Sequence, residues 1–340
     1  MKSEKLYQKI ISFVKSKGFK ELSLNPVLDI KYIRDEKLKK YLFTFKDNKT
    51  NTTFALRPDL SLMSLIEFSK TKNNKKSKIF YSGESYRKNK NINSQIGFEI
   101  YNSNKKEDET EIINISAKIF EKVIGKKGNI SLGNIELFSA IVRQLKLPKR
   151  WEDRLIFLRY NKKYFNEILK RLETNQSLDE NIELDKKLYH KMKKLDPNQI
   201  IANRTIKEIL QRFEEKIYFQ PKPSNGKGSV RVIREFLKIN CPIEKAPLVL
   251  SNFFKKNKLN IQISQDYFPV KKNKIGNLKV RYNSSEIPEV EIYDGLVFSI
   301  RSNKSKNNNK SIIGGRFNSL SDSMGLRKIN ATGSAIYLNK

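Results

Sequence analysis

Two apolar runs with strand-like alternation, separated by a short polar loop, constrain the fold more than any other stretch of the sequence. They are KIFYSGESYR at 78–87 and SQIGFEIYN at 94–102, and the loop between them is KNKNIN. Two such runs are typical of a β-hairpin, so antiparallel sheet is predicted here. Because successive side chains of a strand point to opposite faces, Gln95, Gly97 and Glu99 share one face. A glycine between two polar side chains predicts room for a ligand, although a solvated sheet face would have the same pattern.

The rest of the chain mixes helices with further hairpins. Apolar residues recur at helical spacing within 6–14, 107–123 and 136–145. Two strand-like runs around the polar turn DNKTN predict a second hairpin over 40–59. Strands are again expected toward the end of the chain, beginning with NIQISQDYF at 260–268.

A heavily charged, mainly helical segment lies in the middle of the chain, from about 150 to about 228. PKPSNGKG at 221–228 is the clearest linker, because it combines proline, glycine and serine. Helices, antiparallel hairpins and further strands in this order predict an α+β fold rather than a doubly wound sheet. We expect a single core domain over 1–340, interrupted by the helical insertion.

The formal net charge of +33 is the most extreme number in the composition, and by itself it suggests a polyanionic partner. Of the 69 basic residues, however, only 16 are arginine, and the lysines are spread along all 340 residues. Nucleic-acid sites usually concentrate arginine and aromatic residues on one face, and the sequence has no such block. We therefore interpret the charge as mostly solvated surface lysine and do not expect nucleic acid as a partner.

Metal and cofactor chemistry finds no support in the residue types. The chain has one cysteine, Cys241, and one histidine, His190, which excludes an internal disulfide and a Cys/His zinc cluster. Neither a GxxxxGK(S/T) phosphate loop nor a GxGxxG turn is present, and no strand ends in the acidic pair of a phosphoribosyl-transfer site. No apolar run approaches the roughly 18–20 residues that cross a bilayer. We expect a cytoplasmic protein that uses no metal and no cofactor and does not contact a membrane.

Five stretches resemble, in order along the chain, the core of class II aminoacyl-tRNA synthetases of the histidyl type. They are GFKELSLNPVLD at 18–29, FALRPDLSL at 54–62, SYRKNKNINSQIGFEIYN at 85–102, SLGNIELFSAIVRQLKLP at 131–148, and IYDGLVFSI with IIGGRFNSLSDSMG within 292–325. The third is similar to the second class II motif with its trailing QxGxE, and the last pair to the family's YYxGxVFE and GGRYDxL. The resemblance implies a class II synthetase-like antiparallel sheet flanked by helices, with a helical insertion.

Carried over residue by residue, the resemblance implies an amino-acid pocket. Its members are Asp59, Gln95, Glu99 and Tyr293. Acidic groups in such a pocket would bind an α-ammonium group, while amide and phenol groups would orient an imidazole. Arg87 matches the second-motif arginine, which in the synthetases contacts the α-phosphate of ATP, as a guanidinium fork suits. These five residues are the candidate histidine-binding residues, and no catalytic residue is expected.

Several positions depart from the synthetase pattern. They are Asn89, Asn93, Pro288, Glu289, Ile292, Phe317 and Lys340. Asn89 and Asn93 stand where a synthetase has an acid and an adenine-stacking aromatic residue. Pro288 and Glu289 replace an Arg-Gly pair, and Lys340 is the closest residue to the ATP-binding arginine of the third motif. Amino-acid activation needs such cations to offset charge developing on phosphate, so their loss predicts a protein that does not form an adenylate.

The resemblance is therefore to the non-synthetase members of this group, the regulatory subunits of ATP phosphoribosyltransferase. It implies a homodimer within a hetero-oligomer, paired with the short-form catalytic subunit of that enzyme, which it activates and to which it relays histidine feedback. That enzyme performs the first step of histidine biosynthesis. Two alternatives stay open: a degenerate histidyl-tRNA synthetase paralogue that activates an amino acid, and a basic tRNA-binding module. We also expect no anticodon-binding domain after the core.

Overall fold

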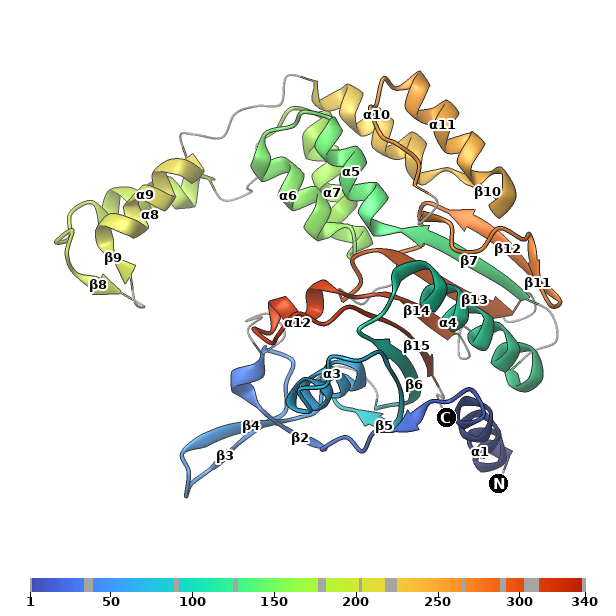
Figure 1. Ribbon diagram of the computed structural model, residues 1–340. Coiled ribbons are helices and arrows are strands. Elements are labelled where there is room, and N and C mark those ends of the chain that lie inside the picture. Colours follow the sequence, from blue (N-terminus) through green and yellow to red (C-terminus); the bar gives the residue numbers. More distant parts are fainter. Residues whose placement is uncertain are drawn as a thin grey trace. The chain divides into compact units, whose positions relative to one another are not determined.

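The chain is divided by its contacts into two compact units, one comprising Met1–Phe138 and Leu237–Lys340 and the other Ser139–Phe236 (Figure 1). The computed structural model describes residues 2–33, 39–88, 92–124, 128–176, 182–201, 204–217, 225–264, 267–287, 292–302 and 312–337. The prediction of a single core interrupted at about 150–228 stays a prediction.

A mixed β-sheet is the core of the first unit. Within the described residues it has ten strands in the order β1-β5-β6-β15-β14-β13-β7-β12-β10, with β11 also paired to β12. Neighbouring strands run antiparallel except for β1–β5 and β7–β12, which run parallel. The strands are β1 (Lys20–Glu21), β5 (Ser77–Ser85), β6 (Asn93–Tyr101), β7 (Gly128–Asn134), β10 (Asn240–Pro242), β11 (Lys274–Ile275), β12 (Leu278–Asn283), β13 (Leu296–Ser302), β14 (Ile312–Arg316) and β15 (Ala331–Tyr337).

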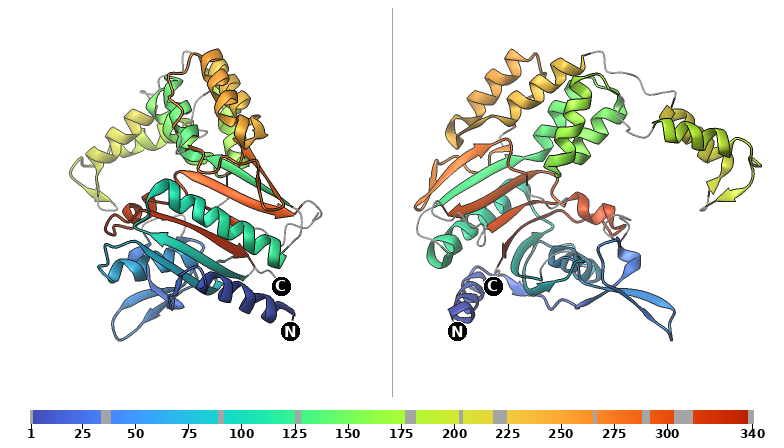
Figure 2. Two further views of the ribbon diagram at one scale, coloured as in Figure 1. Left: turned by 45° about the vertical axis from the view of Figure 1, so that its right-hand side comes forward. Right: turned by 180° about the vertical axis from the view of Figure 1, so that it is seen from behind.

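Helices cover both faces of this sheet. Helix α4 lies across one face (Figure 2). There, Ser116 Oγ is 3.1 Å from Ser334 Oγ of β15. Helix α3 packs on the other face, where the ring of Phe68 stacks on Tyr101 with 4.5 Å between centroids. The helices of this unit are α1 (Lys2–Lys15), η1 (Ile30–Tyr32), α3 (Leu60–Lys70), α4 (Lys105–Ile119), the π-helix η2 (Phe120–Ile124), η3 (Ile243–Lys245), α11 (Ala246–Lys256) and α12 (Ser319–Ser323).

A small three-stranded sheet is tied to the main sheet by Arg57. Its strands, in the order β2-β4-β3, are β2 (Val27–Asp29), β4 (Thr52–Leu56) and β3 (Thr44–Asp47). Arg57 follows β4, and its Nε donates to the Glu84 carbonyl of β5 at 2.7 Å while Nη1 donates to the Leu24 carbonyl at 3.1 Å. Gly83 leaves space for this guanidinium, because a Cβ there would lie 2.5 Å from Arg57 Nη2. The LRPD segment is thereby fixed against β5.

The second unit is mainly helical. Its elements are α5 (Ile135–Gln144), which begins in the first unit, α6 (Lys149–Leu158), α7 (Lys162–Glu173), α8 (Ile182–Met192), β8 (Ile200–Ile201), β9 (Arg204–Thr205), α9 (Ile206–Ile217) and α10 (Gly226–Leu237). Apolar side chains at helical spacing, such as Phe165 and Leu169, are buried between these helices. Gly226 lets α10 begin directly against α7, since a Cβ there would lie 2.2 Å from the Leu172 carbonyl oxygen.

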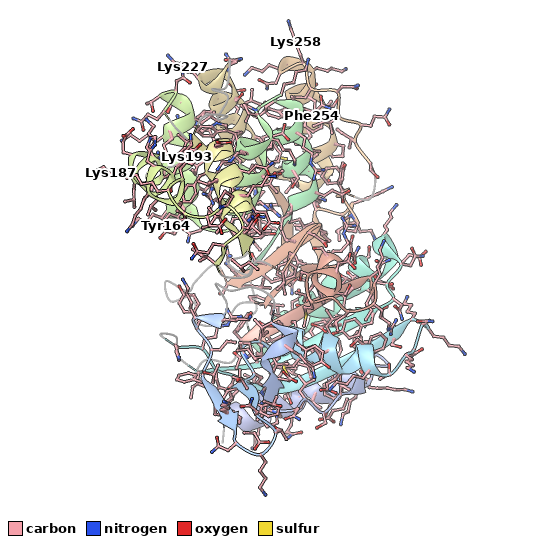
Figure 3. All side chains as sticks on the ribbon, turned by 90° about the vertical axis from the view of Figure 1, so that its left-hand side faces the viewer. Tyr164, Lys187, Lys193, Lys227, Phe254 and Lys258 are labelled. Carbon is pink, nitrogen blue, oxygen red and sulfur yellow. The ribbon has the colours of Figure 1, made fainter. Side chains whose placement is uncertain are left out.

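Lysine side chains extend from the surfaces of both units. Lys187 and Lys227 of the second unit and Lys258 of the first are exposed (Figure 3). Exposure keeps their ammonium groups hydrated and avoids the cost of an unpaired buried charge. Separately, none of the helices in the described ranges has the length and apolar character that a bilayer crossing requires.

Most of the elements predicted for the first unit are confirmed, with one clear exception. The hairpin predicted over 78–102 is the pair β5 and β6, with Gly97 opposite Tyr81. The strand predicted at 260–268 is wrong, because residues 260–264 are irregular. Within the described residues no strand pairs with 260–264, so apolar alternation alone does not make a strand here.

Candidate functional site

The candidate site is built on the face of β6 that carries Gln95, Gly97 and Glu99. Their register partners are Gly83, Tyr81 and Ile79 on β5 and Tyr337, Ala335 and Gly333 on β15. Paired residues of neighbouring strands project to the same face, so these positions form one surface. Gly333 is required beside Glu99, because a Cβ there would lie 2.6 Å from Glu99 Cγ. The strand pairing therefore leaves room for the Glu99 side chain on the β15 side.

Two tyrosine hydroxyls hold the Glu99 carboxylate. Tyr81 donates to Oε1 at 2.7 Å, and Tyr101, two residues along β6, donates to Oε2. Two serines of α3 extend this network, because Ser61 Oγ is 2.8 Å from the Tyr81 hydroxyl and Ser64 Oγ is 2.9 Å from the Tyr101 hydroxyl. Glu99 is 1% exposed, so these hydroxyls take the place of water around its oxygens.

Burial raises the pKa of Glu99 from its ordinary range to about 7. The tyrosine and Ser61 hydroxyls oppose this shift, because hydrogen bonds to a carboxylate favour its charged form. Desolvation is the larger effect, so the carboxyl titrates well above its ordinary range. A cationic group beside it would favour the ionised form.

Asp59 and Arg87 lie beside this network. Asp59 is the N-cap of α3, accepting from the Leu62 amide at 3.1 Å, and its Oδ2 is 3.6 Å from Arg87 Nη2. Arg87 Nε donates to the Pro58 carbonyl at 2.9 Å. The guanidinium is therefore held by the LRPD segment, where it partly neutralises an acid, and only part of its fork faces a ligand.

Tyr293 joins the same group of side chains from the segment before β13. It is 7% exposed, and its ring packs edge-on against Phe317 with 6.3 Å between centroids. Burial raises the pKa of its phenol well above the ordinary range, and the charges of Asp59 and Glu99 raise it further. Gly315 allows this position, since a Cβ there would lie 2.8 Å from Tyr293 Cδ1.

The structure thus brings four of the five predicted residues together, Asp59, Arg87, Glu99 and Tyr293. Asp59 acts electrostatically on Glu99 and Tyr293 and pairs with Arg87. Gln95 is on the same face of β6 as Glu99, and it is 3% exposed. Their role in binding stays a prediction.

Sequence reasoning missed the tyrosines and misjudged the glycine. The space above Gly97 is filled, because a Cβ there would lie 2.3 Å from Tyr81 Cζ. The glycine makes room for a ring of this protein rather than for a ligand. Tyr101 could have been found by alternation, since it lies two residues after Glu99, whereas placing Tyr81 needed the hairpin register. Ser61 and Ser64 depend on how α3 packs, which no local pattern contains.

A second arginine close to the site is fully occupied. Arg316 of β14 is 5% exposed and has Glu109 at 3.4 Å, Glu136 at 2.6 Å and Asp294 at 3.9 Å. A Cβ on Gly295 would lie 2.0 Å from Arg316 Nε, so the glycine lets the guanidinium pass. Three acids around one cation leave it no excess charge to offer a phosphate.

Asn89, Pro288, Glu289 and Lys340 lie outside the described residues, as does the side chain of Asn93. Across the described ranges, no three Cys, His, Asp or Glu side chains are grouped so that they could hold a metal ion.

The family model for histidyl-tRNA synthetase matches residues 1–218 of the chain. A protein of Sinorhizobium fredii named ATP phosphoribosyltransferase regulatory subunit is 23% identical, with 93% of this chain and 88% of that protein covered. A protein of the same name from Allorhizobium ampelinum is 24% identical, covering 93% of this chain and 89% of the relative.

Solved structures show the same fold. The chain resembles an ATP phosphoribosyltransferase regulatory subunit/histidyl-tRNA synthetase from Bacillus halodurans with a TM-score of 0.59 and 13% identity, covering 99% of this chain and 77% of that chain. It also resembles a chain of the ATP phosphoribosyl transferase (HisG:HisZ) complex from Thermotoga maritima, with a TM-score of 0.54, 17% identity, and coverage of 98% and 97%. The predicted fold class, a synthetase-like sheet flanked by helices, is confirmed.

We expect Gly97→Ala to destabilise the first unit by about 1–3 kcal/mol, because the methyl group would overlap the buried ring of Tyr81. Tyr81→Ala should also be destabilising, but the double variant should cost less than the sum, since removing the ring removes the overlap. Chemical unfolding of the four proteins tests this double-mutant cycle. Additive effects would contradict the close contact.

We expect Glu99→Gln to remove a pH dependence of stability. A pKa of about 7 in the folded state lies above the unfolded value, so the folded protein binds more protons between these values and loses stability as pH rises through them. At about 1.4 kcal/mol per pKa unit, the loss approaches about 3 kcal/mol. Unfolding of both proteins at several pH values from about 5 to about 8 measures it. Parallel curves would show that Glu99 titrates normally.

Proposed function

The chain belongs to the histidyl-tRNA synthetase family, and from this premise we propose that it is a non-catalytic regulatory subunit of ATP phosphoribosyltransferase. Its partner in this proposal is the short-form catalytic subunit, with which it forms a cytoplasmic hetero-oligomer and which it activates. It relays histidine feedback to that subunit in the first step of histidine biosynthesis.

The observation that carries the proposal is the extent of its likeness to regulatory subunits. The relatives from Sinorhizobium fredii and Allorhizobium ampelinum align with 93% of this chain and with 88% and 89% of their own lengths. The likeness therefore runs through both units and is not confined to one motif. The Thermotoga maritima protein with the same fold comes from a complex of ATP phosphoribosyl transferase, which supports a catalytic subunit as partner.

The site geometry supports an amino-acid effector better than a nucleotide substrate. The charge of Asp59 raises the pKa of Glu99, so the two acids repel each other, and an α-ammonium or imidazolium group between them would relieve this repulsion. The free part of the Arg87 fork can take an α-carboxylate, while the phenol of Tyr293 can orient an imidazole. These groups match the three polar parts of histidine.

The same geometry supports the absence of catalysis. Adenylation needs cations whose charge is available to the phosphates as negative charge develops in the transition state. Arg87 is shared with Asp59 and the Pro58 carbonyl, and Arg316 is surrounded by three acids. Neither guanidinium is free to follow a reacting phosphate.

The proposal is tested by mixing the purified chain with a short-form catalytic subunit. We expect the two to co-elute in size-exclusion chromatography and the phosphoribosyltransferase rate to rise severalfold, with inhibition by histidine. Glu99→Gln should keep co-elution and stimulation but weaken inhibition at least tenfold, since it removes the charge that binds the effector cation, a loss of about 1.5–3 kcal/mol.

Glu67→Gln is the matched control for this variant, because Glu67 is an outward-facing acid of α3 that pairs with Lys70. It should leave histidine inhibition unchanged. Lack of co-elution would overturn the regulatory role. Co-elution with stimulation but equal inhibition of wild type and Glu99→Gln would overturn only the effector site.

We expect no histidine-dependent exchange between ATP and pyrophosphate. The reason is that the cations needed for adenylate formation are replaced or engaged elsewhere. The assay compares the purified chain with a histidyl-tRNA synthetase at equal concentration. Exchange at a rate comparable to that of the synthetase would favour an amino-acid-activating paralogue instead.

A further inference from the structure

A polar cavity of about 220 Å³ lies on the sheet of the first unit, over strands β7, β12 and β13. The side chains that line it and matter here are Ser131, Arg281, Asn240, Glu286, Ser299 and Arg301. A water molecule occupies about 30 Å³ in the liquid, so the cavity has room for about seven waters or a small organic molecule. It involves none of the five candidate histidine-binding residues.

Strand register explains why these side chains converge. Ser299 of β13 pairs with Ser131 of β7, and Ser131 pairs with Arg281 of β12. Partners in adjacent strands project to the same face, so two hydroxyls form the floor and a guanidinium stands at one side. Arg301, two residues after Ser299, projects to this face from the other side. Donors thus reach the cavity from three directions.

Gly133 allows the chain after β12 to close over one end of the cavity. A Cβ at Gly133 would lie 2.4 Å from the Glu286 carbonyl oxygen, so a side chain there would push this segment away. The Glu286 carboxylate is 5% exposed, and its Oε1 is 3.2 Å from Arg301 Nη2. Glu286 therefore neutralises part of the charge of Arg301 and fixes its orientation.

Two donors at the cavity are available to a ligand, the Ser299 hydroxyl and one nitrogen of Arg281. Ser299 is 1% exposed, and its Oγ has no hydrogen bond within the part of the chain that the structure describes. Arg281 uses Nε and Nη2 to bind Asn240, at 2.8 and 3.1 Å, which leaves Nη1. Buried polar groups are nearly always hydrogen-bonded, so an unmet hydroxyl on the floor of a polar cavity indicates a bound molecule.

We propose that this cavity binds the phosphoryl group of a small phosphate-bearing molecule. Two guanidinium groups and one carboxylate give the lining side chains an excess of one positive charge, which selects an anion. Guanidinium forks and hydroxyls are suited to phosphoryl oxygens. Donors that arrive from both sides and from the floor fit a tetrahedral anion better than a planar carboxylate. The remaining volume holds the organic part of the molecule.

The test uses the full chain and glycerol 3-phosphate as the probe, titrated by calorimetry at about physiological salt because unspecific binding to the basic surface is screened there. We expect one saturable site. Arg281→Gln should weaken binding at least tenfold, because it removes a charge-assisted hydrogen bond. Ser299→Ala should weaken binding severalfold without lowering the unfolding temperature of the unliganded protein, since its hydroxyl has no partner to lose.

Arg231→Gln is the charge-matched control, because Arg231 is an exposed arginine of α10 outside the cavity. Neither this variant nor Glu99→Gln should change the affinity, and glycerol should not bind. Inorganic phosphate binding as tightly as the probe would still support the phosphoryl site but would assign no role to the organic part. Unsaturable binding, equal weakening by Arg231→Gln, unchanged binding in Arg281→Gln and Ser299→Ala, or tighter binding of succinate would each overturn the proposal.

Discussion

The buried Glu99 carboxylate and the two tyrosine hydroxyls that donate to it are the interaction on which the candidate site depends. A carboxylate that is 1% exposed is costly unless its oxygens are hydrogen-bonded, and Tyr81 and Tyr101 supply those bonds. The Tyr81 ring in turn needs the space at Gly97, and both hydroxyls contact serines of α3. The hairpin register, the glycine and the helix are therefore parts of one arrangement, and Asp59 enters it as the cap of that helix.

The parts of this arrangement that depend on strand or helix periodicity could be predicted from the sequence. The β5–β6 hairpin, α3 and the shared face of Gln95 and Glu99 follow from local periodicity, because strand and helix periods are properties of adjacent residues. The filling of the space above Gly97 could not be predicted, since Tyr81 reaches it across a pairing that joins distant positions. The absence of a strand at 260–264 has the same origin, because whether an alternating segment pairs with another strand depends on residues distant in the sequence.

The acids that neutralise its arginines distinguish this site from one that stabilises a reacting phosphate. Two arginines of the family's motifs are present, but Arg316 has three acids around it and Arg87 shares its fork with Asp59 and a carbonyl. A motif match identifies an arginine but not the acids around its side chain. The acids around Arg316 come from α4, α5 and the segment before β13. The resemblance therefore identifies the family, while the neighbours of each arginine decide what the arginine can do.

Regulation and catalysis place different demands on such a site. Catalysis requires groups that bind the transition state more tightly than the substrate, so cations must be free to meet charge that develops during the reaction. An effector site needs only differential affinity for two states of an assembly, and fixed, already paired groups satisfy that requirement. A Glu99 pKa of about 7 would suit the second role, since a cationic group beside the carboxyl would favour its ionised form. An effector site on this fold would therefore need the network of Glu99, Tyr81 and Tyr101 even where no adenylate is formed.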